Sequence, residues 1–332
     1  MQYRQLGSSG IEASVIGLGT TAIGGTEDIK PDDKASIRTI HAALDHGFNL
    51  IDTAPSYGWG RAEEIVGRAI KGRRDKVVIA TKCGVWWQDK RGSFNGLKDG
   101  RRTYISLHPD TIKIELENSL KRLSVDTIDL LQCHKPAIPP NQTPIAETME
   151  CLLDLKRQGK IRAIGVSNVS FDQLEEYLLA GDLDSNQFRY SMLVRSPEQD
   201  TLPYCAKKKI ATLTYLSLEQ GLLTGKMGAD YIFGQNDFRA NIGDYMPWFK
   251  SHNRQKLRHM FLGWTDLINK YECSFSALTL AWTAAQTGAT HILSGCKDIE
   301  QAEANAKAGS IKLTNEELLR IRKDVVALGE AS

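Results

Sequence analysis

Residues 48–58 read FNLIDTAPSYG, residues 77–84 read VVIATKCG and residues 128–136 read IDLLQCHKP. Each stretch begins with a short apolar run and changes to polar side chains within a few residues. Short runs that are almost wholly apolar are typical of strands covered on both faces, as in a parallel sheet. The three stretches therefore predict a parallel sheet whose strands carry polar groups at their ends.

Eight runs of this kind follow one another along the chain, separated by amphipathic stretches of helical periodicity. The predicted strands are Val15–Leu18, Asn49–Asp52, Val77–Thr81, Ile128–Cys133, Ala163–Val166, Ser185–Tyr190, Ala211–Tyr215 and His291–Leu293. Eight strands alternating with about eight helices predict an α/β protein of the (β/α)8 TIM barrel type. The alternative, a doubly wound open sheet, usually carries a G-x-G-x-x-G loop, whereas this chain has Ala22 in place of a required glycine.

Three segments lie outside the repeating pattern. Gly7–Gly10 separates two short extended stretches, which predicts an N-terminal hairpin at the N-terminal end of the barrel. Gly84–His108 and Glu219–Lys250 follow the third and seventh strands, so they belong to the C-terminal face, where barrel enzymes build their active sites. Loops this long are usually functional, and their aromatic residues either wall a pocket or pack among themselves. We expect residues 1–332 to form a single domain.

Composition excludes several classes of protein. The chain has 332 residues, with 42 Lys and Arg against 40 Asp and Glu, so its formal net charge is +2. A charge so close to zero gives no reason to expect nucleic acid or an anionic membrane as a partner. No stretch approaches the roughly 20 apolar residues of a membrane span. The six cysteines form no CxxC pair, which favours free thiols, no metal site and a cytoplasmic location.

Four ionisable side chains gather at three successive strand ends. They are Asp52, Tyr57, Lys82 and His134. Each of them alone has an ordinary structural explanation, such as a helix cap, a solvated cation or a packed imidazole. Their coincidence at one edge of a barrel is what predicts a catalytic site.

These residue types together can deliver a proton to a carbonyl oxygen. A tyrosine hydroxyl ordinarily has a pKa near 10, and a nearby ammonium group lowers that pKa by favouring the phenolate. An aspartate beside the lysine keeps it charged, and a neutral histidine can hydrogen-bond the substrate oxygen. An alternative role for Lys82 is a Schiff base with a carbonyl substrate. That role needs a neutral amine, which an adjacent aspartate opposes.

Several motifs, in their order and spacing, resemble those of the aldo-keto reductase superfamily from about Tyr3 to Leu328. They are FNLIDTAPSYG (48–58), ATK (80–82), DLLQCHKP (129–136), GKIRAIGVSN (159–168), GLLTGK (221–226) and SGCKDIEQAEAN (294–305). The pattern is most similar to the bacterial general-stress and potassium-channel β-subunit branch. The resemblance implies a (β/α)8 barrel that transfers hydride from a nicotinamide without a metal.

The resemblance also implies roles for individual residues. Tyr57 would be the general acid in reduction and the base in oxidation. Lys82, paired with Asp52, would tune that tyrosine, and His134 would orient the carbonyl group. The implied cofactor contacts are Gly19, Thr20, Thr21, Ser167, Asn168, Gln187, Tyr215, Leu216, Ser217, Leu218, Gly221, Lys226, Arg239, Gly295, Lys297, Gln301 and Asn305. We expect Trp86, Trp87 and Trp248 to line the substrate pocket.

A cationic site at the adenosine end favours a phosphorylated cofactor. The eighth predicted strand leads into a helix starting near Ile299, and the free N–H groups of a helix N-terminus favour an anion. Lys297 adds a positive charge there, and Lys226 and Arg239 add charge from the preceding long loop. We therefore expect NADP(H) rather than NAD(H).

The sequence thus predicts an NADP(H)-dependent oxidoreductase that interconverts aldehydes or ketones with alcohols, sugar-like compounds included. Its expected partner is a small carbonyl or alcohol substrate, and no helix shows an apolar surplus that would specify an oligomer. An alternative of a different class is a cofactor-binding regulatory or redox-sensing subunit with residual reductase activity. The complete set of four catalytic residues favours the enzyme.

Overall fold

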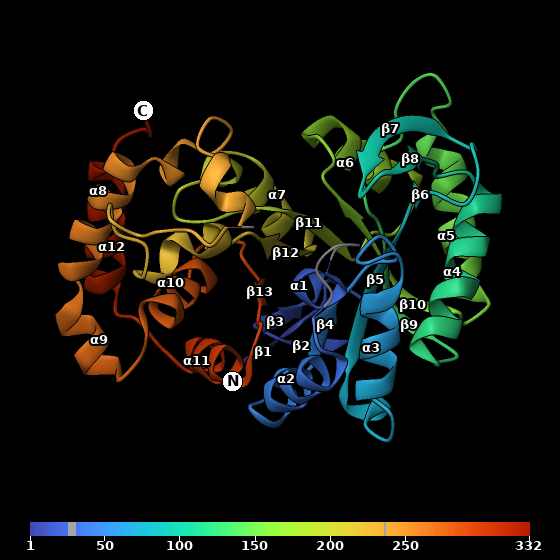
Figure 1. The fold of residues 1–332 in the computed structure, drawn as a ribbon. Coiled ribbons are helices and arrows are strands. Elements are labelled where there is room, and N and C mark those ends of the chain that lie inside the picture. The colour runs from blue at the N-terminus through green and yellow to red at the C-terminus, as the bar shows by residue number, and fades with distance from the viewer. Residues whose placement is uncertain (26–30, 236) are drawn as a thin grey trace.

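The computed structural model describes residues 1–25, 31–235 and 237–332, and a closed barrel of eight parallel strands lies at its centre (Figure 1). The barrel strands are β3 (Ile16–Gly19), β4 (Leu50–Asp52), β5 (Val78–Cys83), β9 (Ile128–Cys133), β10 (Ile161–Ser167), β11 (Ser185–Arg189), β12 (Ala211–Tyr215) and β13 (His291–Gly295). They pair in chain order, and β13 pairs with β3 to close the ring. The predicted (β/α)8 TIM barrel is confirmed, and every predicted strand overlaps an observed one.

Helices connect the strands and surround the barrel (Figure 1). Their bounds are α1 (Thr21–Gly24), α2 (Asp33–Asp45), α3 (Arg61–Ala69), α4 (Pro109–Leu123), α5 (Ile145–Arg157), α6 (Phe171–Ala180), α7 (Thr201–Lys208), α8 (Ser251–Leu262), α9 (Thr265–Tyr271), α10 (Phe275–Ala284), α11 (Ile299–Ala308) and α12 (Asn315–Ala327). Local sequence sets several of these ends. Ser170 and Gln173 form a capping box at the start of α6, and Thr314 and Glu317 form another at the start of α12.

The N-terminal hairpin packs against the interior of the barrel. Strands β1 (Tyr3–Gln5) and β2 (Glu12–Ser14) are antiparallel, as predicted. Leu6 and Ile11 between them are buried together with barrel residues such as Leu130 and Leu213. Complete burial of one such side chain contributes roughly 1.5–3 kcal/mol. The hairpin therefore fills the end of the barrel that carries no candidate catalytic group.

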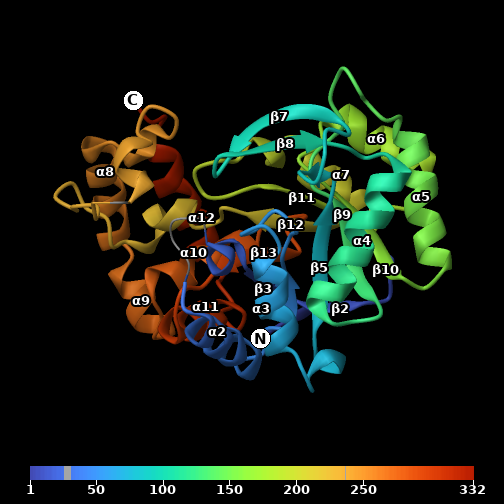
Figure 2. The ribbon, with the colours of Figure 1, turned by 45° about the vertical axis from the view of Figure 1, so that its right-hand side comes forward.

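The two long segments differ in structure. Residues 84–108 contain a three-stranded antiparallel sheet of β6 (Val85–Trp86), β7 (Ser93–Lys98) and β8 (Arg101–Ile105). In Figure 2, β7 and β8 project over the barrel. In residues 219–235 and 237–250 the regular elements are instead short 3-10 turns, η3 (Glu219–Thr224), η4 (Phe238–Asn241) and η5 (Pro247–Phe249).

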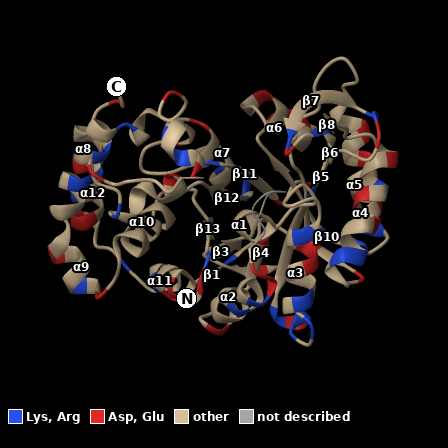
Figure 3. Cartoon of the chain, in the orientation of Figure 1, with Lys and Arg blue, Asp and Glu red and all other residues tan. Residues whose placement is uncertain are grey.

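A second apolar cluster lies among α8, α9, α10 and α12, on the left of Figure 1. Trp264 and Trp282 are fully buried at its centre. Lys and Arg alternate with Asp and Glu along the outer helices (Figure 3), as the net charge of +2 suggests. That the whole chain is a single domain stays a prediction.

No helix among the described residues combines the length and the apolar character that crossing a membrane requires. All six cysteines are free thiols, and only Cys273 is partly exposed.

Candidate active site

Lys82 and Asp52 form a buried ion pair at the ends of neighbouring strands β5 and β4. The Lys82 Nζ lies 2.5 Å from Asp52 Oδ1 and 2.9 Å from Oδ2, and it donates to the Thr53 carbonyl oxygen at 2.9 Å. The two side chains are 0% and 4% exposed. Burial alone would lower the pKa of Lys82, but the neighbouring Asp52 and Tyr57 outweigh burial and raise it. Lys82 is therefore held as a cation.

Tyr57 lies beside this cation in the loop after β4. The Lys82 Nζ donates to the Tyr57 hydroxyl at 3.4 Å and lies 5.1 Å from the centre of its ring. Close backbone contact fixes the loop: a Cβ on Gly58 would come within 2.2 Å of the Gly24 carbonyl oxygen, and Gly58 has a φ of 59°. Only glycine fits there without displacing the backbone that positions Tyr57.

His134 completes the group at the end of β9. Its ring centre is 5.9 Å from that of Tyr57, with the rings edge to face, and its backbone N–H donates to the Cys83 carbonyl oxygen at 2.9 Å. Burial and then the positive charges of Lys82, Lys135 and Lys98 hold the pKa of His134 well below its ordinary value. The imidazole is therefore neutral and can donate a hydrogen bond from one nitrogen.

Two glutamine amides support the Asp52 carboxylate from across the barrel. Gln132 Nε2 donates to Asp52 Oδ2 at 3.2 Å, and Gln187 Nε2 donates to the same oxygen at 3.0 Å. Gln187 is a predicted cofactor contact, and its amide oxygen hydrogen-bonds to no described residue, so it can still accept a bond from a ligand. The sequence prediction missed Gln132, although a lone amide in the apolar run of β9 is a detectable signal.

Ser167, Asn168 and Tyr215 meet at the ends of β10 and β12. The Tyr215 hydroxyl donates to Asn168 Oδ1 at 2.6 Å, and Asn168 Nδ2 donates to Ser167 Oγ and to the His134 carbonyl oxygen, each at 3.0 Å. Asn168 has a φ of 61°, a conformation that asparagine tolerates better than most residues. The predicted carboxamide contacts are thus adjacent to the four candidate catalytic residues.

A comparison with models of protein families identifies the family of this chain. The model described as the aldo/keto reductase family matches residues 15–324. The chain belongs to the aldo/keto reductase family. Within this reductase, the four converging residues occupy the carboxyl ends of the barrel strands, where barrel enzymes carry their chemistry.

Curated and solved proteins are similar to this reductase over almost its whole length. The NADH-specific methylglyoxal reductase of Escherichia coli K12 is 42% identical, covering 99% of both chains. The aldo-keto reductase YhdN of Bacillus subtilis is 41% identical over 96% of this chain and 91% of its own length. The structure of the glycerol dehydrogenase AKR11B4 from Gluconobacter oxydans superposes with a TM-score of 0.86 at 36% identity, covering 98% of this chain and 95% of that one. An aldo-keto reductase from Klebsiella pneumoniae in complex with NADPH has a TM-score of 0.70 at 26% identity, covering 97% and 95%.

The rim of the barrel between β3 and β13 carries almost no side chains. Gly19 pairs with Gly295 in the strand register, and a Cβ on either residue would make only ordinary contacts. The hydroxyl of Thr20 donates to the Asp52 carbonyl oxygen at 3.0 Å, while Thr21 begins α1 and is exposed. This part of the reductase leaves room for a ligand to approach the backbone closely.

The loop after β12 turns sharply where phosphate contacts are predicted. Leu216 and Gly221 have positive φ values of 54° and 99°, and the Ser217 hydroxyl donates to the Tyr190 carbonyl oxygen at 3.1 Å. Leu218 is half-buried and packs against the apolar clusters. The exposed Lys226 follows and hydrogen-bonds to no described residue.

A carboxylate that the sequence prediction missed lies within the predicted cationic site. The guanidinium group of Arg239 donates three hydrogen bonds of 2.6–3.1 Å to Asp237, and the Arg239 backbone N–H donates one more at 3.1 Å. The guanidinium group also donates to the Gln220 carbonyl oxygen at 2.9 Å. Chiefly through Arg239, with a smaller effect of Lys297, the pKa of Asp237 is lowered. The charge of Lys297 thus acts on the carboxylate that Arg239 binds, and Asp237 neutralises part of the charge of Arg239.

The end of β13 leads into α11 as predicted. Asp298 caps the helix by accepting from the Gln301 N–H at 2.8 Å, and the Gln301 side chain bonds to both Asp298 and the Lys297 N–H. Asn305 is buried and donates to Ser294 Oγ at 2.8 Å. The Gln301 side chain thus lies at the helix N-terminus beside the backbone of Lys297, while Asn305 hydrogen-bonds to the strand that precedes the helix.

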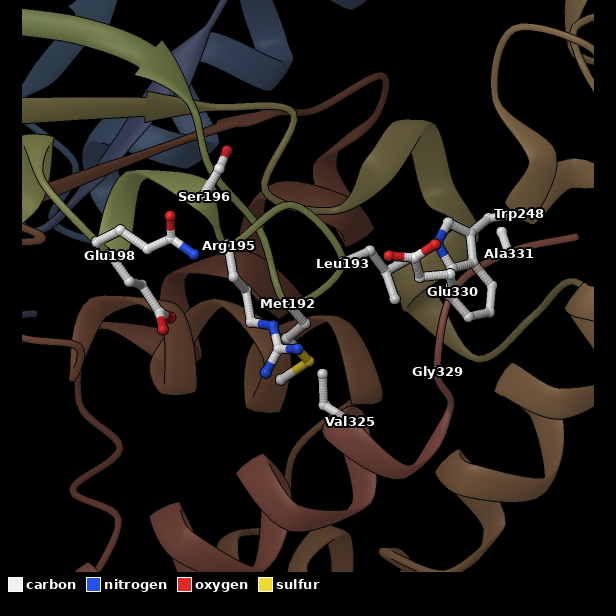
Figure 4. A pocket seen from close by; sticks show the side chains of 11 residues that line it. Met192, Leu193, Arg195, Ser196, Glu198, Trp248, Val325, Gly329, Glu330 and Ala331 are labelled. Carbon is white, nitrogen blue, oxygen red and sulfur yellow. The ribbon is translucent and has the colours of Figure 1, made fainter. Parts of the chain in front are cut away.

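The three predicted pocket tryptophans occupy different environments. Trp87 is half-buried and packs edge to face on Trp59 at 5.4 Å between ring centres, close to the Tyr57 loop. Trp86 belongs to β6, is fully buried, and its indole N–H donates to Asp89 at 2.7 Å. Trp248 lines a separate cavity of about 680 Å³ together with Arg195 (Figure 4). No candidate catalytic residue lines that cavity.

Aromatic residues of the long segments also pack among themselves. Tyr231 contacts Phe233 at 5.1 Å between ring centres, and Phe233 contacts Phe249 at 6.2 Å. Phe94 and Tyr104 pair in the same way across β7 and β8 at 5.9 Å. These five residues therefore follow the alternative of packing among themselves, and a substrate-pocket wall made by the aromatic residues of the two segments stays a prediction.

Proposed function

We propose that this aldo/keto reductase interconverts aldehydes or ketones with alcohols by direct hydride transfer, with Tyr57 as general acid and base. The observation that carries the proposal is the Lys82 ammonium, held by Asp52 while it lies 3.4 Å from the Tyr57 hydroxyl. A fixed cation at that distance stabilises the phenolate that forms when the tyrosine gives up its proton.

Each residue then has a defined task in reduction. A bound nicotinamide supplies the hydride that reaches the carbonyl carbon. His134, being neutral, donates a hydrogen bond to the carbonyl oxygen and orients it. Tyr57 transfers its hydroxyl proton to that oxygen, and Lys82 stabilises the resulting phenolate until water returns a proton. Oxidation of an alcohol runs through the same groups in reverse.

The polar groups beside the four catalytic residues suit a nicotinamide. Its carboxamide both donates and accepts hydrogen bonds. The matching donors and acceptors come from Ser167, Asn168 and the free amide oxygen of Gln187. To bind the carboxamide through Oδ1, Asn168 must lose the hydrogen bond that it accepts from the Tyr215 hydroxyl. The Tyr215 ring is then free to lie against a flat ligand. The bare rim at Gly19 and Gly295 supports the approach of the dinucleotide backbone.

We propose NADP(H) as the cofactor, with a modest preference. Arg239 and Lys297 support a contact with the 2′-phosphate, as does the similar structure that contains NADPH. Two observations argue against a strong preference. Asp237 neutralises part of the charge of Arg239, and one relative is named NADH-specific. The relatives named methylglyoxal reductase and glycerol dehydrogenase support small oxygenated substrates.

The structure argues against a Schiff-base role for Lys82. A lysine that attacks a carbonyl must first be neutral, whereas the pKa of Lys82 is raised by its neighbours although burial opposes this. A regulatory subunit remains the second candidate function, because the family fold alone does not require turnover. The six free thiols support a cytoplasmic location.

The test is turnover of NADPH and NADH with a panel of small aldehydes, ketones and alcohols, together with cofactor binding by fluorescence. We expect oxidation of the reduced cofactor with aldehydes and tighter binding of NADPH. Cofactor binding without turnover of any panel member would favour the regulatory subunit. Equal or tighter binding of NADH would refute the proposed NADP(H) preference.

A further inference from the structure

The tip of the β7–β8 hairpin lies against the candidate active site. Lys98 pairs with Arg101 in the strand register, and Asp99 and Gly100 form the two-residue turn between them. Both turn residues have positive φ, 49° and 75°, which is the conformation of a type I′ turn and explains the Asp-Gly sequence. A tight turn of this kind fixes the positions of the two flanking side chains.

Lys98 points its ammonium group from this turn towards Tyr57. Its Nζ donates to the Ser56 carbonyl oxygen and lies 6.0 Å from the centre of the Tyr57 ring and 5.6 Å from that of Trp59. Lys98 as a whole is exposed, yet partial burial lowers its pKa, with Asp99 acting in the opposite direction. No described carboxylate forms an ion pair with it.

Among the residues that the structure describes, three lysines act on this side of the site. Lys82, Lys98 and Lys135 all act on His134. Lys82 has a carboxylate partner in Asp52, whereas Lys135 makes only a 3.5 Å contact with Asn95. One bond to a carbonyl oxygen leaves Lys98 two further N–H donors, because an ammonium group has three. An incompletely paired ammonium beside a proton donor is suited to bind an anion.

We propose that Lys98 binds an anionic group of the substrate, so that the preferred substrates are aldehydes or ketones carrying a carboxylate a few bonds from the carbonyl. The proposal rests on the function proposed above and adds no chemical step. Hydride still reaches the carbonyl carbon and the Tyr57 proton still reaches the oxygen. Lys98 contributes binding and orientation, which lowers KM for the anionic substrate more than it raises kcat.

Two four-carbon aldehydes test the proposal, because 4-oxobutanoate and butanal differ chiefly in a terminal carboxylate against a methyl group. We expect the wild-type protein to favour 4-oxobutanoate by about tenfold in kcat/KM, the value of one charge-assisted hydrogen bond. Lys98→Met should reduce that ratio by about tenfold, mainly through KM. Added salt should reduce the wild-type ratio as well, because the interaction is partly exposed.

The matched control is Lys90→Met, an exposed lysine of the same segment that forms no hydrogen bond or ion pair with a described residue. It should leave the ratio unchanged. If Lys98→Met lowers kcat/KM for both aldehydes equally, Lys98 only anchors the hairpin to Ser56 and the proposal is wrong. Turnover of butanal without a preference for 4-oxobutanoate refutes the substrate class alone. Absence of turnover with either aldehyde and with the whole carbonyl panel refutes the function on which it rests.

Discussion

Asp52→Asn is expected to destabilise the protein in a way that depends strongly on pH. The substitution keeps the shape of the side chain but removes the charge that lies 2.5 Å from Lys82 Nζ. Both side chains are almost inaccessible to water. The variant therefore keeps a buried ammonium group without its counter-charge, which costs about 3–5 kcal/mol of unfolding free energy near neutral pH.

The sign of the pH dependence follows from the pKa of Lys82. In the wild-type protein that pKa is raised above the ordinary 10.5, so its stabilising contribution is complete below pH 10.5 and is lost only above it. In the variant, burial without Asp52 depresses the pKa, and stability rises with pH as Lys82 releases its proton. The difference between the two proteins therefore shrinks above neutral pH, by up to about 1.4 kcal/mol per pH unit.

The assay is urea denaturation followed by tryptophan fluorescence at several values between neutral pH and about pH 10, the ordinary lysine range. Asp129→Asn is the matched control, because Asp129 is equally buried but is paired with Arg74 and Arg162. Arginine does not titrate in this range, so the cost of Asp129→Asn should stay constant. A cost of Asp52→Asn that is equally constant would refute the assignment of Lys82 as a cation held by Asp52.

Two further substitutions have expected outcomes. Asp237→Asn should increase the affinity for NADPH relative to NADH by about fivefold, because it removes the carboxylate bound to Arg239. Fluorescence titration measures the two affinities, and an unchanged ratio would show that Asp237 does not affect the phosphate site. Glu115→Gln should flatten the pH dependence of stability between about pH 4.5 and 8, because burial raises the pKa of Glu115 to about 8. A buried carboxyl group with a raised pKa makes the wild-type protein lose about 3–5 kcal/mol of stability as the pH rises through that range. A wild-type stability that does not fall there would contradict a raised pKa of Glu115.

The barrel was predictable because its signals are local. Strand β9 is buried along its whole length and most of its residues are apolar, and the capping boxes at Ser170 and Thr314 occur where the sequence places them. The convergence of Asp52 and Lys82 followed from the rule that parallel strands end on one face. Each of these inferences uses residues within one element or the topology of the barrel.

The features that the sequence did not predict depend on contacts between distant segments. Only folding exposes the Asp237 carboxylate, bound by Arg239, to the charge of Lys297. The sequence predicts a long loop over Gly84–His108, yet cross-strand pairs within it form a hairpin that carries Lys98 to the Tyr57 loop. The burial of Trp86 was not predictable either. Whether an aromatic residue of a long segment is exposed or buried depends on what the rest of the fold packs against it.

Tyr57→Phe tests the central claim most directly. The variant keeps the ring and its contacts with His134 and loses only the hydroxyl that lies 3.4 Å from Lys82 Nζ. Turnover and cofactor binding should be measured on the same preparation. The proposed mechanism predicts a loss of about 10²–10⁴ in kcat, the usual contribution of a general acid, with cofactor affinity nearly unchanged. A variant that keeps most of its kcat would show that the proton comes from another group and would contradict the mechanism.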